Sequence, residues 1–176
     1  MNSILTAAAA LLLSVTPALS QSWQDVLDEA LGQTVYFHAW GGDQRTNDFI
    51  ASVGDEVLDR HGVTLQHVRL ADTADAVARV LAERAAGREE NGSVDLIWLN
   101  GPNFLAMKDQ GLLYGPFVAD LPNAQWLDLS EGSPNSVDFT VPVEGLESPW
   151  RLAKFVFTYD GARIDAPPAD MAGWVD

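Results

Sequence analysis

Segments typical of strands and segments typical of helices alternate along the first hundred residues. Thr34–Trp40 is β-branched and aromatic, which predicts a strand, and residues 49–58 carry apolar side chains at helical spacing. A second strand is predicted over residues 63–70, and Thr73 is expected to cap the helix after it. Val94–Leu99 is almost continuously apolar, as in a parallel strand covered on both faces. Short turns between such segments favour right-handed crossovers, so the pattern predicts an α/β fold with a doubly wound parallel sheet.

Glycines and capping residues predict where further helices begin and end. Ser22 can cap a short amphipathic helix that Gly32 ends in a left-handed conformation, and Gly62 is expected to end the next helix. The turn Asn100-Gly-Pro-Asn103 leads into another helix, which is expected to stop at Gly111.

The second half of the chain has weaker patterns. Residues 112–136 are rich in Pro, Gly, Asn and Ser and are expected to be irregular, with Trp126 and Leu127 packed against the fold. Strands are predicted over Val137–Val143 and Leu152–Tyr159. From these patterns we expect four parts: a signal peptide at 1–20, a first α/β lobe at 21–136, crossover strands at 137–160, and at 161–176 the start of a second lobe that is only begun.

The N-terminus has the pattern of a secretory signal. The first 20 residues carry no charge, Ile4–Leu13 is apolar, and Pro17–Ser20 ends the run with small residues. These features predict a signal peptide cleaved after Ser20. The alternative is an uncleaved membrane anchor, but the apolar run is shorter than the ~20 residues that a membrane-spanning helix needs.

The net charge and the absence of cysteine limit the possible binding partners and chemistry of the chain. The formal net charge is −15, which argues against nucleic acid or an anionic membrane as a partner, because both require positive charge to replace counterions. The absence of cysteine excludes a disulfide framework, thiolate chemistry and the lipid-bearing cysteine of an anchored lipoprotein. With an export signal, these features predict a soluble periplasmic protein, expected to be a monomer.

Three loops are candidates for ligand binding: Trp40–Asp43, Asn100–Asn103 and Ser148–Trp150. In an open parallel sheet, ligands bind beyond the carboxyl ends of the strands, where helix N-termini present unpaired N–H groups. The alternative is that each loop is an ordinary connection between a strand and a helix. The predicted ligand-binding residues are Trp40, Gly41, Gly42, Asp43, Asn100, Asn103, Glu144, Ser148 and Trp150.

Motifs for catalysis, cofactors and metals are not found. Gly41-Gly42 lacks the third glycine of a dinucleotide fingerprint and a following Walker lysine. His38, His61 and His67 have irregular spacing, without carboxylates at ligand offsets. Ser148 does not stand in a G-x-S-x-G setting. We therefore expect no catalytic residue, no cofactor and no metal site.

Several segments resemble the type II periplasmic solute-binding proteins of ABC transporters. Val94–Leu99 with Lys108–Leu113 resembles that family's strand, helix and Gly-Leu-Leu passage. Trp150–Asp160, followed by Ile164-Asp-Ala-Pro-Pro and Gly173-Trp174, is similar to its crossover strand, Pro-containing turn and following helix. Phe37–Asp43 is similar to the first strand and ligand loop of a thiamine-transporter-like branch.

The resemblance implies a binding function without chemistry. It implies that the protein captures a small solute in the periplasm and delivers it to an ABC permease in the inner membrane, with the ligand held between two lobes. Asp43, Glu144 and Glu147, together with Trp40 and Trp150, favour a cationic solute, because carboxylates and indole rings both attract cations. A neutral sugar stacked on tryptophan is an alternative ligand. A periplasmic hydrolase or transferase with the same two-lobed architecture, and a fragment that only mediates interactions, are the alternative functions.

Overall fold

The structure is a computed structural model that describes residues 22–151, 156, 158–170 and 172–174. It divides into two compact units, Met1–Leu99 (unit 1) and Asn100–Asp176 (unit 2). The predicted signal peptide, and most of the strand predicted over Leu152–Tyr159, lie outside the described residues. No helix in the described ranges is both long enough and apolar enough to cross a membrane.

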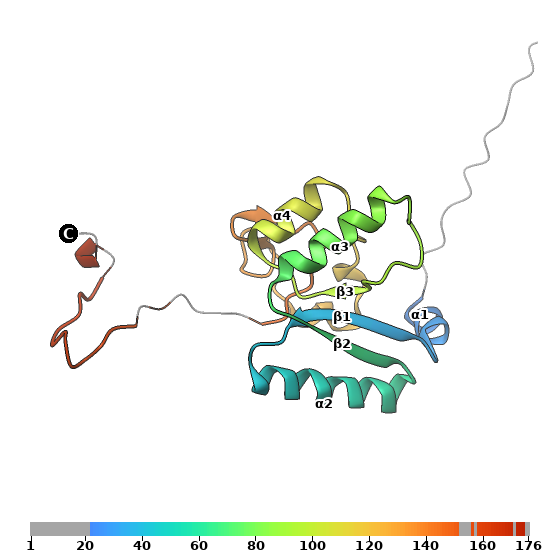
Figure 1. Cartoon of the computed structure of the whole chain (residues 1–176), viewed down its shortest axis with the longest axis horizontal. Coiled ribbons are helices and arrows are strands. Elements are labelled where there is room, and N and C mark those ends of the chain that lie inside the picture. The colour runs from blue at the N-terminus through green and yellow to red at the C-terminus, as the bar shows by residue number, and fades with distance from the viewer. Residues whose placement is uncertain (1–21, 152–155, 157, 171, 175–176) are drawn as a thin grey trace, which may run out of the picture. The chain divides into compact units, whose positions relative to one another are not determined.

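Unit 1 is an α/β unit built on a three-stranded parallel sheet (Figure 1). Its elements in chain order are α1 (Trp23–Ala30), β1 (Thr34–Trp40), α2 (Gln44–His61), β2 (Thr64–Leu70), α3 (Thr73–Ala85) and β3 (Leu96–Ile97). The strand order is β2-β1-β3, and α2 and α3 lie on opposite faces of the sheet. The predicted alternation and the parallel sheet are therefore confirmed for this unit.

The core of unit 1 lies between the sheet and α2. Phe37 and Ala39 of β1 pack with Ile50 of α2, and Leu65 and Trp98 pack against this cluster. Ile50 is only 1% exposed. Because side chains alternate across a strand, Phe37 and Ala39 share the face that α2 covers.

Capping residues set the helix ends of unit 1 much as their types predict. Ser22 and Asp25 form a reciprocal capping box at the start of α1. Gly62 ends α2 with φ 66°, in the left-handed region that glycine adopts without steric cost. The predicted cap of α3 is wrong by one residue. Asp72, rather than Thr73, is the N-cap, and its carboxylate accepts a hydrogen bond from the Ala74 N–H at 2.8 Å.

Strand β3 is shorter than the predicted Val94–Leu99. Its pairing with β1 is nevertheless extended at both ends by bonds outside the regular ladder. The Asp95 carboxylate accepts from the Tyr36 N–H at 2.8 Å, and the Trp98 N–H donates to the His38 carbonyl at 2.9 Å. The apolar run therefore follows β1 as predicted, although only two of its residues have ladder geometry.

Unit 2 contains little regular structure. It has the helix α4 (Gly101–Asp109), the 3₁₀ turns η1 (Val118–Asp120), η2 (Pro122–Trp126) and η3 (Ala172–Trp174), and the antiparallel pair β4 (Val137–Asp138) and β5 (Val141–Pro142). The irregular connection predicted over 112–136 agrees with these short turns. Trp126, however, is 80% exposed, so its predicted packing is wrong.

The single strand predicted over Val137–Val143 is also wrong, because the chain reverses within it. Phe139 and Thr140 have φ angles of 43° and 75°, and positive φ at both central residues is the mark of a type I′ hairpin turn. Pro142, which lacks the N–H needed inside a sheet, ends the second strand.

Candidate functional site

The sheet order of unit 1 creates a topological switch point. From β1 the chain passes over α2 to β2 on one side, and from β2 it passes over α3 to β3 on the other side of β1. Doubly wound sheets bind ligands where the order reverses, beyond the carboxyl ends of the strands. Here those strands are β1 and β3, and two of the predicted ligand loops follow them in the chain.

The loop after β1 requires both of its glycines. A Cβ on Gly41 would lie 2.7 Å from the Arg69 Cβ, and a Cβ on Gly42 would lie 2.3 Å from Cζ2 of Trp40. The indole of Trp40 therefore lies directly over the Gly42 backbone. Trp40 is 40% exposed, so one part of its ring packs on the loop while another part faces solvent.

Asp43 and Asn47 hold this loop to the start of α2. Oδ2 of Asp43 accepts hydrogen bonds from the Thr46 N–H at 2.9 Å and the Thr46 hydroxyl at 2.7 Å. The hydroxyl bond, followed by the backbone bond, lowers the pKa of the Asp43 carboxyl. Asn47 Nδ2 donates to the Gly41 carbonyl at 3.0 Å. Asp43, predicted as a ligand residue, thus acts as the N-cap of α2.

In unit 2, the predicted residues Asn100 and Asn103 stand at the N-terminus of α4. Asn100 is the N-cap, but its side chain makes no capping hydrogen bond. Asn103 donates its backbone N–H to the Asn100 carbonyl at 3.2 Å. The Gly101 N–H donates to Oδ2 of Asp138 in the hairpin, so a carboxylate occupies this positive end of the helix.

The hairpin and the loop after it gather charged groups around α4. Lys108 donates to the Pro142 carbonyl at 2.5 Å and pairs with Oε2 of Glu144 at 3.0 Å. The charge of Glu144, a predicted ligand residue, is therefore balanced within unit 2. Burial, followed by repulsion from the Asp138 carboxylate, raises the pKa of Glu147 to about 7.

The remaining predicted residues, Ser148 and Trp150, follow Glu147 in the same loop. Ser148 is exposed, and Trp150 is 38% exposed, so neither belongs to the core.

The structure thus groups the predicted residues by unit. Trp40, Gly41, Gly42 and Asp43 are clustered in unit 1, while Asn100, Asn103, Glu144, Ser148 and Trp150 belong to unit 2. Their placement around one common cleft stays a prediction.

Two residues of this region, Asp138 and Phe139, were missed by sequence reasoning. The ring of Phe139 would lie 3.5 Å from a Cβ on Gly101, so it covers the α4 N-terminus, and 73% of Phe139 is exposed. Both residues were assigned to a continuous strand. Pro142, inside that predicted strand, was the available signal that the strand was broken.

No cluster of three or more His, Cys, Asp or Glu side chains suited to a metal ion occurs among the residues that the structure describes. Three of the carboxylates discussed above have a local role: Asp43 caps a helix, Asp138 accepts from Gly101, and Glu144 pairs with Lys108.

These features define an α/β protein with a doubly wound, three-stranded parallel sheet. The chain is similar to Protein YnjB of Escherichia coli (strain K12), with 44% identity over 149 residues. The matched region is 85% of this chain and 37% of YnjB, so the chain spans little more than a third of that relative's length. No protein-family model and no solved structure matches the chain.

Proposed function

We propose that this chain is part of a periplasmic solute-binding protein of the type II fold, the component of an ABC importer that captures a small solute and delivers it to the membrane permease. The observation that carries the proposal is the strand order β2-β1-β3, which sets the switch point between the ends of β1 and β3. The resemblance of the sequence to that family and the predicted export signal support it independently.

The pairing of the carboxylates indicates which of them could attract the proposed cationic ligand. Asp43 is engaged with Thr46 and Glu144 with Lys108, so neither brings an uncommitted charge. Glu147 and Asp138 are the pair whose mutual repulsion a cation would relieve. The exposed part of Trp40 offers a ring face that attracts a cation by roughly 0.5–2 kcal/mol when the contact is desolvated.

A thermal-shift screen of the full chain tests this proposal, because a ligand that binds only the folded state raises the melting temperature. The panel contains thiamine, spermidine, glucose and sulfate. We expect stabilisation by a cation. Stabilisation by glucose or sulfate alone would exclude the cationic class and leave solute binding intact, whereas turnover of any member would favour the enzyme alternative.

Substitution of the two most exposed tryptophans of unit 1, Trp40 and Trp23, locates the site. Trp40→Ala should weaken binding of the active cation about 10-fold, from the loss of a cation–π contact. Trp23→Ala is the matched control, because Trp23 lies on α1 and is 44% exposed, close to the exposure of Trp40. Titration calorimetry measures both affinities. An equal loss in the two variants would remove the β1 loop from the site.

A further inference from the structure

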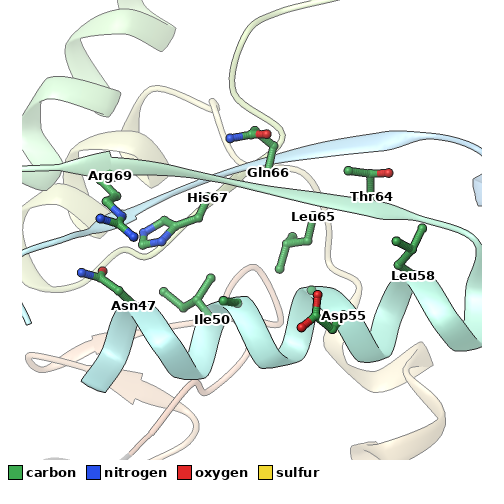
Figure 2. A pocket seen from close by; sticks show the side chains of 11 residues that line it. Asn47, Ile50, Asp55, Leu58, Thr64, Leu65, Gln66, His67 and Arg69 are labelled. Atoms are coloured by element: carbon green, nitrogen blue, oxygen red, sulfur yellow. The ribbon is translucent and has the colours of Figure 1, made fainter. Parts of the chain in front are cut away.

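A pocket of about 370 Å³ lies in unit 1 between α2 and β2 (Figure 2). This volume is within the range of small-molecule sites. Ile50, Ala51 and Leu58 of α2 and Leu65 of β2 give it an apolar wall. Asn47, His67 and Arg69 lie together at one end, and Leu58 and Thr64 lie at the other (Figure 2). The pocket therefore has a polar end and an apolar body.

The backbone of β2 adds hydrogen-bonding groups to this pocket. Thr64 donates its N–H to Gln33 at the start of the ladder with β1, and the carbonyl of Leu70 accepts from Gly41 at its end. Because backbone groups alternate in direction along a strand, the even-numbered residues of β2 bond toward β1. The N–H and C=O groups of Leu65, His67 and Arg69 then point to the other side. In the described sheet β2 is an edge strand, so no further strand pairs with these groups.

The polar end carries a positive charge and an unpaired acceptor. Among the described residues, none of the ion pairs includes Arg69. Oδ1 of Asn47 is buried without a hydrogen-bond partner in the described chain, and Asn47 is only 4% exposed. A buried acceptor without a donor is costly, so a ligand donor at this point would be favoured. Nε2 of His67 lies 3.3 Å from the Ala39 carbonyl, which leaves Nδ1 of the neutral ring as an acceptor.

A carboxylate elsewhere in the pocket does not cancel this charge. Asp55 also lines the pocket, but it stands eight residues after Asn47 on α2. At the rise of an α-helix this spacing is about 12 Å, which exceeds the screening length of roughly 8–10 Å in physiological salt. An anion beside Arg69 is therefore attracted more strongly than Asp55 repels it.

We propose that the pocket between α2 and β2 binds a small organic acid that carries a hydroxyl beside its carboxylate and an aliphatic chain. The carboxylate accepts hydrogen bonds from the Arg69 guanidinium, which suits its planar geometry. The hydroxyl donates to Asn47, and the aliphatic chain lies along Leu65 and Ile50. The proposal does not rest on the proposed transport function. The polar end of the pocket adjoins the loop after β1, because Asn47 bonds to the Gly41 carbonyl and Arg69 packs against Gly41.

Three probes separate these contacts in the full chain. Leucic acid has the carboxylate, the neighbouring hydroxyl and the aliphatic chain. Isocaproic acid lacks the hydroxyl, and leucic amide lacks the charge. Titration with backbone amide NMR gives the affinity and the location together. We expect leucic acid to bind most tightly and to shift the amides of β2 and of the first turns of α2, with isocaproic acid several-fold weaker and the amide at least about 10-fold weaker.

The decisive variant is Arg69→Gln, which should weaken leucic acid at least about 10-fold. Arg60→Gln is the matched control, because it removes the same charge from α2 at an exposed residue that does not line the pocket. Three results would each overturn the proposal. The first is equal binding of leucic acid and its amide, and the second is equal binding of leucic acid by Arg69→Gln and the unchanged chain. The third is no binding of leucic acid at millimolar concentration. The comparison of the probes on the unchanged chain keeps the test valid if Arg69→Gln fails to fold.

Discussion

Each of the two units is stabilised internally in a different way. In unit 1, Phe37, Ala39 and Ile50 form one core between a parallel sheet and α2, and the backbone is paired along β1 and β2. Unit 2 buries Phe104, Met107, Val118 and Val143, but its backbone is mainly turns and two-residue strands. Its large apolar side chains Tyr114 and Trp126 are 87% and 80% exposed.

This difference has consequences for local stability. Regions with few regular hydrogen bonds and much exposed apolar surface open at lower free energy than a packed sheet. Amides of β1 should therefore exchange more slowly than amides of α4. Unit 1 provides a rigid support for its loop, whereas the α4 N-terminus is held by single contacts such as Gly101 to Asp138 and Lys108 to Glu144.

The largest expected effect comes from removing one core side chain in each unit. Ile50→Ala should lower the free energy of unfolding of unit 1 by about 2–5 kcal/mol, and Phe104→Ala should lower that of unit 2 by about 3–5 kcal/mol. Native-state hydrogen exchange should show faster exchange in β1 and β2 for the first variant and in α4 for the second. If either variant raised the exchange rates of both units equally, the two units would unfold together. The proposed difference in their stability would then be wrong.

The contrast also explains which parts of the structure could be predicted. In unit 1 the determinants are local: β-branched and aromatic residues predicted the position of β1, and Gly62 predicted the end of α2. The order β2-β1-β3, and thus the switch point, comes from the structure, because right-handed crossovers are equally possible in the order β1-β2-β3. The loop after β1 could be located from the sequence because it lies where a regular element ends.

In unit 2 the determinants are distant in sequence. The hairpin at Phe139 and Thr140 has neither the Asn nor the Gly that normally marks a type I′ turn, so its local signal favours a strand. Asp138 gains its role only through Gly101, a residue 37 positions earlier. Lys108 likewise reaches Glu144 across the fold of the unit. Such pairings cannot be recognised in one sequence, and they are what the sequence reasoning missed.

Substitutions at residues with positive φ should lower the stability of unit 1 and raise the stability of unit 2. Gly62→Ala should destabilise unit 1 by about 1 kcal/mol, because alanine resists the φ of 66° at the end of α2. The double substitution Phe139→Asn and Thr140→Gly should stabilise unit 2 by about 1 kcal/mol, because both new residues suit the type I′ turn. Urea unfolding followed by amide signals from each unit measures both. If the double variant is no more stable than the original chain, the contact of the Phe139 ring with Gly101 stabilises unit 2 by at least as much as the strained turn destabilises it.

Removing the caps of α2 and α4 should give a smaller and unequal effect. Asp43→Ala removes the acceptor of two hydrogen bonds from Thr46 and should lower the melting temperature by about 3 °C. Asn100→Ala should leave it nearly unchanged, since the Asn100 side chain makes no capping hydrogen bond. Differential scanning calorimetry measures the two shifts. Equal losses would indicate that Asn100 has a structural role beyond capping.

The smallest expected effect concerns pH and also separates the units. In the described part of unit 1, the resolved pKa shifts of Asp25, Asp43 and Glu83 are all downward, so these carboxyls stabilise that unit above pH ~4 and lose this contribution in acid. In unit 2 the shifts go both ways: hydrogen bonds from Ser130 lower the pKa of Asp128, whereas burial raises the pKa of Glu147 to about 7, from an ordinary value of 4.5. A raised carboxyl pKa gives a contribution that is complete below 4.5 and is lost as the pH rises through about 7.

Glu147→Gln should therefore flatten the decline in unit 2 stability between pH 4.5 and about 7, and leave unit 1 unaffected. Because Glu147 is only about half buried, solvent screening should keep the effect below ~1 kcal/mol. Asp138→Asn serves as an intermediate variant, because it removes only the smaller cause of the raised Glu147 pKa. It should therefore reduce the decline in unit 2 stability without abolishing it. The asparagine side-chain oxygen can still accept the hydrogen bond from Gly101. Carboxyl ¹³C titration of Glu147, together with urea unfolding at several pH values, measures both. A Glu147 signal that titrates near pH 4.5 would show that this carboxyl is solvated, and the loss of stability expected in unit 2 between pH 4.5 and about 7 would then be absent.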